Sequence, residues 1–272
     1  MADQGCPQRR QVELRHARDS LRTELRYWRA EATQVTLEKH QTQIERVADM
    51  IEAALKQLND EPAAGETERI LDLYHVWDFF RAKLALRYVE PITGFLDAAD
   101  ELAWAMYRPA VLATAHAGAV LREPPLVFLD RGTVPFASAR GSSYRDLLPR
   151  DVRTSAGAAA ASQLPFPVIG VPWYLSGHLP GALLVAHEVG HHVEDDCALT
   201  AALEARLAAA DLADGRPAVW QPWLGEVFAD VVASVTGGVA YPTMLFDALA
   251  NAPTGGAGRE HYPRRGCAPT YA

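Results

Sequence analysis

The segment LLVAHEVGHHVEDD, residues 183–196, contains two histidines four residues apart, His187 and His191. On a helix this spacing puts both imidazoles on one face, near enough to share a single metal ion. Glu188 is rotated by about 100° from His187 around such a helix, so its carboxylate would lie beside the metal rather than on it. There it can act as a general base toward a water molecule. This H-E-x-x-H pattern predicts a catalytic zinc site.

A catalytic zinc ion generally takes three protein ligands and leaves one position open. Cys197 stands six residues beyond His191, and as the third ligand its thiolate would close the site. The better candidate lies in QPWLGEVFADVVASVTGG, where Glu226 and Asp230 are four residues apart on a predicted helix. Glu226 can supply the third ligand. Asp230, one turn later, can accept the free N–H of a ligand histidine and orient its ring.

Both predicted helices need apolar faces to pack them into the domain. Pro180 can occupy the first turn of the helix that carries His187 and His191. His192 is turned away from His191 and is expected to pack or to support a ligand. The helix around Glu226 is expected to pack inside the domain through Val227, Phe228, Val231 and Val232.

The two motifs together, H-E-V-G-H followed by E-V-F-A-D, resemble the gluzincin branch of the zincin metallopeptidases, whose pattern is H-E-x-x-H followed by E-x-x-[SA]-D. The pair is also similar to uncharacterised bacterial zincin-like proteins with helical extensions. The resemblance covers about residues 165–263. It implies a single Zn²⁺ with His187, His191 and Glu226 as ligands, Glu188 as general base, and Asp230 as a hydrogen-bonding support for the ligands.

Some proteins of that group carry a later H-P-P segment, and EHYPRRG offers His261 and Pro263 with Tyr262 between them. The resemblance implies that His261 or Tyr262 donates a hydrogen bond to the tetrahedral oxyanion. The alternative is a surface loop near the end of the chain.

Composition excludes several other classes of protein. The net charge of −8 argues against a nucleic-acid binder, because phosphate neutralisation supplies most of that affinity. No apolar run approaches the roughly 20 residues of a membrane helix. The start of the chain lacks the apolar stretch of a secretory signal, and Cys6, Cys197 and Cys267 are too scattered for a disulfide framework. We therefore expect a cytoplasmic protein that binds neither membranes nor nucleic acids.

Residues 1–120 are predicted to form a helical N-terminal region. Between residues 12 and 58, apolar and charged residues both recur at sevens, with a slip in register near ATQVT that predicts either one long helix or two. The pattern is compatible with a solvated helix face, or with a coiled-coil seam for self-association or a protein partner. Further helices are predicted over residues 70–88 and 92–119, the latter kinked or broken near Pro109. His75 and His116 are expected to be structural.

Residues 121–272 are predicted to form the zincin-like domain, with a small twisted sheet beside the two metal-bearing helices. PPLVFLD predicts a strand, FASARGSSYRDLLPRD a loop and a short helix, and PFPVIGVPWYLSG a second strand. Pro172 confines that second strand to an edge or to its own end. An edge strand there could bind an extended peptide through its main chain.

The sequence therefore predicts an α+β fold and a zinc-dependent peptidase that acts on peptides or proteins. Two alternatives stay open. One is a zinc-containing binding or regulatory module that acts through its N-terminal helices without catalysis. The other is a peptidase that cleaves a single partner protein.

Overall fold

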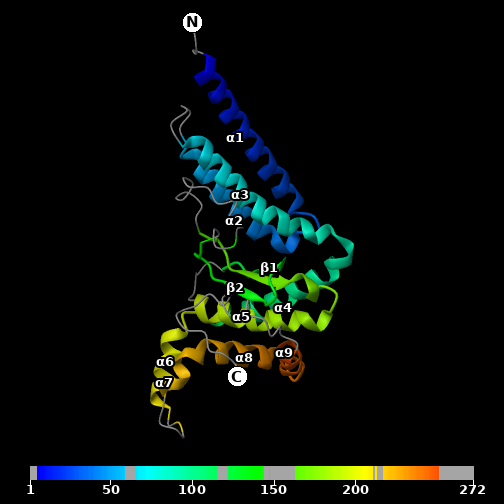
Figure 1. The fold of residues 1–272 in the computed structure, drawn as a ribbon, viewed down its shortest axis with the longest axis vertical. Helices are drawn as coiled ribbons and strands as arrows, with labels where there is room; N and C mark the ends of the chain where they lie inside the picture. The colour runs from blue at the N-terminus through cyan, green and yellow to red at the C-terminus, as the bar shows by residue number, and fades with distance from the viewer. Residues whose placement is uncertain are drawn as a thin grey trace. The chain divides into compact units, whose positions relative to one another are not determined.

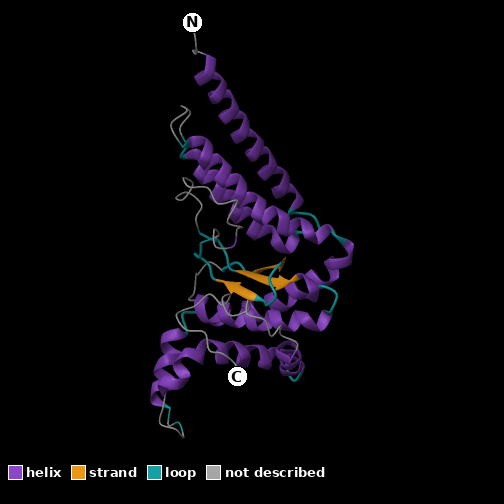
Figure 2. Ribbon diagram, in the orientation of Figure 1, coloured by secondary structure: helices purple, strands orange, loops and turns teal. Residues whose placement is uncertain are grey.

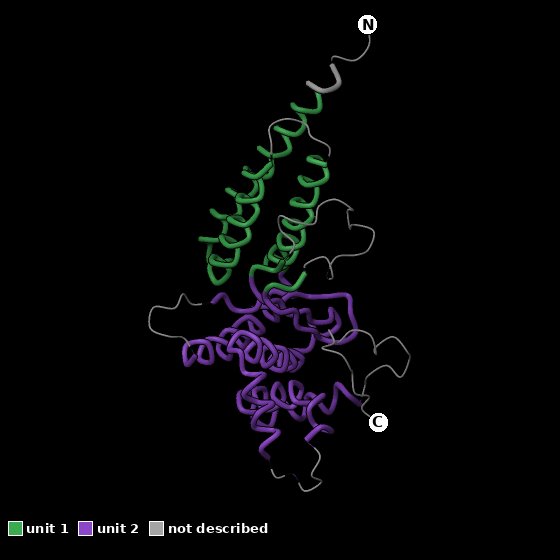
Figure 3. The backbone as a smooth tube through the Cα atoms, turned by 90° about the vertical axis from the view of Figure 1, so that its left-hand side faces the viewer, with its two compact units in different colours: residues 1–89, 141–165 green, residues 90–140, 166–272 purple. Residues whose placement is uncertain are grey.

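The structure is a computed structural model, and it describes residues 5–58, 65–114, 122–143, 147, 163–210, 212 and 217–250. The chain divides into two compact units, Met1–Val89 with Gly141–Pro165, and Glu90–Arg140 with Phe166–Ala272 (Figure 3). Helices predominate and a small mixed sheet accompanies them (Figure 2). This is the α+β class that the sequence predicts.

In its described residues the first unit contains three α-helices, α1 (Gly5–Glu31), α2 (Gln41–Lys56) and α3 (Glu66–Ala85). Each of them contacts the other two. Short 3₁₀ turns, Glu38–His40 and Leu86–Tyr88, precede α2 and follow α3. The end of α1 and the start of α2 confirm the interruption predicted around ATQVT.

The apolar residues that recur at sevens form the core of this first unit, and the charged residues of the same repeat stay outside it, as on a solvated helix face. Val35 is the exception, with 82% of its surface exposed. Because α1, α2 and α3 cover one another's apolar residues, burial of this seam needs no second molecule. Self-association or partner binding through these helices stays a prediction. The buried members of the repeat are Leu14, Leu21, Trp28, Leu37, Ile44, Ile51 and Leu58.

Helix α4 (Glu90–Thr114) belongs to the second unit, although the sequence analysis grouped it with the N-terminal region. It runs without a break through Pro109, where we expected a kink or a break. Proline removes one hydrogen bond, to the carbonyl four residues earlier. That carbonyl belongs to Ala105, an exposed residue, so water can satisfy it. The predicted end of the helix and His116 lie outside the described residues.

The sheet has the strand order β1-β3-β2, in which β1 (Leu126–Asp130) pairs parallel and β2 (Phe136–Ser138) antiparallel with β3 (Val168–Pro172). Both predicted strands are confirmed. The loop predicted at Phe136–Ser138 is wrong, because these residues form β2. Phe136 pairs with Gly170, and a Cβ at Gly170 would lie 2.2 Å from the Phe136 ring. The glycine therefore makes room for the aromatic ring of the neighbouring strand.

Strand β3 lies in the centre of the described sheet, so the alternative that placed it at an edge is wrong. Pro172 is its last residue and pairs with Asp130 of β1. The pairing with β2 involves only Val168–Gly170. The missing N–H of Pro172 therefore costs no hydrogen bond to β2, and the outer strands of the described sheet are β1 and β2.

The second unit is layered around α5 (Leu183–Asp196), which lies between the sheet and α8 (Leu224–Gly237) in Figure 1. Helix α4 contacts β1 and α5, while α5 also contacts β2 and β3. Helix α9 (Ala240–Ala250) packs on both α5 and α8. The shorter α6 (Thr200–Ala209) and α7 (Pro217–Trp220) lie between α5 and α8 in the chain. In the described part of the chain, no helix is long and apolar enough to cross a membrane.

Candidate metal centre

Helix α5 brings both motif histidines into the interior of the second unit. Pro180 lies in the first turn of the 3₁₀ segment Leu179–Ala182, which continues directly into α5. Every residue from Leu184 to Gly190 is buried. Because α4, the sheet and α8 all contact α5, its polar side chains must find partners on these neighbouring elements. His187 and His191, one turn apart, both face α8.

Gly190 allows α8 to approach α5 closely. A Cβ at Gly190 would lie 2.6 Å from the Cα of Ala229 and 3.0 Å from its Cβ, and no flexible side chain is available there to move aside. Ala229 itself is fully buried. The glycine of H-E-V-G-H and the alanine of E-V-F-A-D therefore pack against each other. This contact brings the histidines of one helix to the carboxylates of the other.

Three ligand atoms converge between the two helices. The Nε2 of His187 lies 3.1 Å from the Nε2 of His191 and 3.2 Å from the Oε2 of Glu226. The Nε2 of His191 lies 3.8 Å from the same Oε2. Among the described residues, His187, His191 and Glu226 are the group of three whose ligand atoms all lie within 4.8 Å of one another. The residues predicted as ligands from the motif spacing are brought together.

The donor set suits a tetrahedral cation such as Zn²⁺. Bond lengths of about 2.0–2.1 Å to nitrogen and oxygen correspond to ligand atoms about 3.3 Å apart in a tetrahedral site. The three observed separations are close to that value. Two imidazoles and one carboxylate leave a fourth position open, as catalytic zinc sites do.

Asp230 supports His187 from behind, as predicted from its position one turn after Glu226. The Nδ1–H of His187 donates to the Oδ1 of Asp230 over 2.8 Å. Burial would raise the pKa of Asp230, but its hydrogen bonds with His187 and Tyr241 lower it. Burial likewise would lower the pKa of His187, yet its hydrogen bonds to Asp230 and Glu226 raise that pKa to about 10. At neutral pH His187 is therefore protonated, with Nδ1–H directed at Asp230 and Nε2–H at Glu226, and a cation bound at the shared position would replace the Nε2 proton.

Tyr241 of α9 completes the cluster and is not among the site residues predicted from the sequence. Its hydroxyl lies 2.5 Å from the Oδ1 of Asp230 and 3.1 Å from the Nδ1 of His187. Tyr241 is 1% exposed. The signal in the sequence is the glycine pair Gly237–Gly238, which marks a turn that could return a following side chain to α8.

Glu188 is buried beside the ligands, with 3% of its surface exposed. Burial raises its pKa to about 7, against the opposing charge of His187, and the nearby charge of Glu226 raises it further. A carboxyl whose pKa lies near neutral pH can both accept and return a proton. It therefore has the property that a general base requires.

The other two histidine side chains of α5 are neutral at physiological pH. Burial lowers the pKa of His191 to about 4, and the nearby charge of His187 contributes. Neutral imidazole is the form that binds a metal. Burial also lowers the pKa of His192 to about 4, and its Nε2–H donates to the carbonyl of Val168 in β3. His192 therefore joins α5 to the sheet, which agrees with a packing role.

The packing expected of α8 through Val227, Phe228, Val231 and Val232 is wrong for two of these residues. Val227 and Val231 are 41% and 53% exposed, Phe228 and Val232 are half-buried, and the residues that this helix buries are Ala229 and Ala233. The contact with α5 is made by a small side chain, that of Ala229. The polar Glu226 and Asp230 take the side that faces α5.

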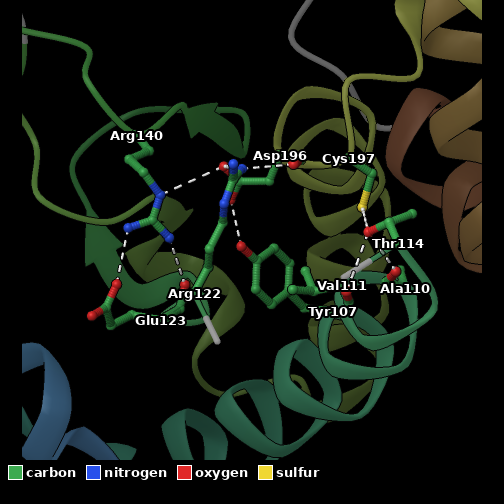
Figure 4. Close-up of polar contacts among 9 residues, drawn as sticks. All are labelled: Tyr107, Ala110, Val111, Thr114, Arg122, Glu123, Arg140, Asp196 and Cys197. Carbon is green, nitrogen blue, oxygen red and sulfur yellow. Dashed lines mark hydrogen bonds and ion pairs between the residues drawn. The ribbon is translucent and has the colours of Figure 1, made fainter. Parts of the chain in front are cut away.

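Asp196 fixes the end of α5 to α4 and to the segment before β1 (Figure 4). The hydroxyl of Tyr107 and Nη1 of Arg122 donate to its carboxylate, and Arg140 forms an ion pair with it. The thiol of Cys197 accepts a hydrogen bond from Thr114 over 3.3 Å. Cys197 is not in the three-residue group, so its role as a third ligand is not supported. His261 and Tyr262 lie outside the described residues.

No protein-family model, no curated protein and no solved structure matches this chain. The function has to be inferred from the residues of the site themselves.

Proposed function

We propose that this protein is a zinc-dependent peptidase of the gluzincin type. The observation that carries the proposal is the convergence of His187 Nε2, His191 Nε2 and Glu226 Oε2 between α5 and α8. Bound there, Zn²⁺ would polarise the scissile carbonyl and lower the pKa of water toward about 7. The carboxylates of Glu226 and Asp230 both contact His187, and negative charge at a partly buried site favours a cation nearby.

Glu188 is the proposed general base. It takes the proton of the attacking water and passes it to the departing amine, because a pKa of about 7 permits both transfers at neutral pH. Asp230 holds the Nδ1–H of His187, which fixes the tautomer of the ring and the direction of Nε2. Glu226 and His191 complete the ligand set without a proton to move.

The proposed substrate is an extended peptide segment. Strand β2 contacts α5 and is an outer strand of the described sheet, whereas β3, which the sequence suggested for this role, lies between its two neighbours. An extended chain could add to the outer edge of β2 through main-chain hydrogen bonds, near the helix that carries Glu188.

Substitution of Glu188 by glutamine tests the proposal. The amide keeps the size of the side chain and one acceptor but cannot take a proton at neutral pH. Wild type, Glu188→Gln and Glu194→Gln would be loaded with one equivalent of zinc and incubated with a peptide library read by mass spectrometry. Glu194 is a matched control, a buried glutamate on the same helix whose carboxylate accepts from Thr200 instead.

We expect cleavage by wild type and Glu194→Gln, and its loss in Glu188→Gln with zinc retained. A wild-type protein that binds zinc but cleaves no peptide or protein substrate would contradict the proposal. It would favour the binding or regulatory module in its place.

A further inference from the structure

Tyr241 reaches the proposed metal centre because two glycines end α8. Gly238 has φ +55°, a left-handed backbone that other residues rarely adopt. A Cβ at Gly237 would lie 3.0 Å from the Cβ of Tyr241, so the glycine lets α9 start directly against the end of α8. Tyr241, the second residue of α9, is thereby buried against both other helices of the site.

The hydrogen bonds at Tyr241 have a defined direction. A carboxylate only accepts, so the tyrosine O–H donates to the Oδ1 of Asp230, 2.5 Å away. The Nδ1–H of His187 donates to the same oxygen over 2.8 Å, and the phenol oxygen lies 3.1 Å from that nitrogen. Two donors from two helices therefore hold one carboxylate oxygen.

Asp230 needs such a restraint. Its side chain is 34% exposed, whereas that of His187 is 11% exposed. A partly exposed carboxylate is free to rotate toward water unless another group fixes it, and rotation would release the Nδ1–H of His187. The buried hydroxyl of Tyr241 is the group in contact with both.

We propose that Tyr241 is a positioning residue of this centre. Its hydroxyl holds Asp230 in the rotamer that keeps Nδ1–H of His187 bonded, so that Nε2 points to His191 and Glu226. Tyr241 does not act on substrate, because its hydroxyl contacts the ring nitrogen opposite the one that faces the other ligands. The inference rests on the proposed zinc site and adds α9 to the elements that determine its affinity.

Tyr107 provides a matched control for the removal of the hydroxyl. Like Tyr241 it is 1% exposed, lies on a helix of the second unit and donates to an aspartate, here Asp196 (Figure 4). The carboxylate of Asp196 contacts Tyr107, Arg122 and Arg140, and none of these is a proposed ligand. Tyr107→Phe and Tyr241→Phe therefore remove the same chemical group, and only the second removes it from the centre.

The experiment measures zinc affinity at one fixed pH by competition with a chromophoric chelator, and the visible spectrum after Co²⁺ loading. We expect Tyr241→Phe to bind zinc about 10-fold more weakly, at the lower end of what partners of ligand histidines contribute. Its Co²⁺ spectrum should be altered. Tyr107→Phe should match wild type in both. In an Asp230→Ala background, Tyr241→Phe should have no further effect, because the hydroxyl acts through that carboxylate.

Wild-type protein that binds no zinc would overturn the proposed function and this inference together. Wild-type affinity in folded Tyr241→Phe, an equal loss in Tyr107→Phe, or an undiminished effect without Asp230 would overturn this inference alone. If circular dichroism shows that Tyr241→Phe does not fold, Asp230→Asn is measured in its place. Unchanged zinc affinity in Asp230→Asn would also overturn this inference.

Discussion

At the scale of single residues, Glu188 combines a structural cost with a chemical use. Its carboxyl is buried near Glu226, and burial together with that negative charge raises its pKa to about 7, against the opposing charge of His187. A position that served packing alone would be more stable with a neutral side chain. A role for Glu188 in proton transfer explains why an acid occupies this buried position.

This penalty predicts how Glu188→Gln changes stability. The folded-state pKa lies above the unfolded value of 4.5, so the folded state binds the proton more tightly, and wild-type stability should fall as the pH rises from about 4.5 to about 7. At pH 8 in the presence of a chelator, Glu188→Gln should be more stable by up to about 3 kcal/mol, at about 1.4 kcal/mol per pKa unit. At pH 4 the difference should vanish. Urea unfolding measures it, and a glutamine variant less stable at pH 8 would contradict the burial argument.

Residues with a fixed spacing along one helix were the predictable part of the site. His187 and His191, or Glu226 and Asp230, share a helix face because they are four residues apart, and any helix of that sequence would bring them together. Tyr241 could not be predicted in the same way. Its position depends on the angle at which α9 leaves α8, and the local sequence does not specify that angle.

At the scale of elements, the α5–α8 contact determines the geometry of the site. Gly190 and Ala229 meet at the point of closest approach, one residue before His191 and one before Asp230. A glycine inside a helix lowers its stability relative to alanine, by about 0.8–1.0 kcal/mol. Here the glycine is explained by the approach of a second backbone.

Substituting this glycine should therefore loosen the centre. Gly190→Ala forces a methyl group against the backbone of α8, and we expect a loss of about 1–3 kcal/mol in the free energy of unfolding together with weaker zinc binding. Gly94→Ala in α4 is the control, because a Cβ there has no neighbour within 4 Å. It should be neutral or stabilising. Denaturant unfolding and chelator competition measure both effects, and equal behaviour of the two variants would refute the close contact.

The sequence did not predict which apolar residues face inward on α8, nor strand β2. Both depend on pairs that are distant in the chain. The apolar residues of α8 have the composition of a core face, but the residues that the helix buries are the small Ala229 and Ala233, of which Ala229 meets Gly190 of α5. Phe136–Ser138 is too short to show an alternating pattern, and its pairing depends on the space that Gly170 leaves for the Phe136 ring.

At the scale of the whole molecule, all of the proposed ligands and their supports belong to one of the two units. The helices of the first unit bury their apolar seam among themselves and contribute no residue to the group of three. Metal binding should therefore stabilise the second unit and leave the stability of the first unit unchanged. A ligand stabilises the state that binds it, in proportion to the logarithm of its concentration over Kd.

Hydrogen exchange with and without one equivalent of zinc tests this separation. We expect slower exchange in α5, α8 and α9 when zinc is present, because opening of these helices would release the ion. Exchange in α1, α2 and α3 should change little. Addition of a chelator should reverse the effect, and His187→Ala should abolish it. Protection of similar size in the first unit would show that the metal is bound elsewhere or is coupled to the entire chain.

The zinc X-ray absorption spectrum of the protein with one equivalent of bound zinc tests the assigned ligands most directly. We expect a first shell of nitrogen and oxygen only, at about 2.0–2.1 Å, with the outer-shell scattering of two imidazoles. His191→Ala should reduce that imidazole scattering by half. A sulfur ligand at about 2.3 Å, or a shell of oxygens without imidazole, would contradict the assignment of His187, His191 and Glu226 as the metal centre.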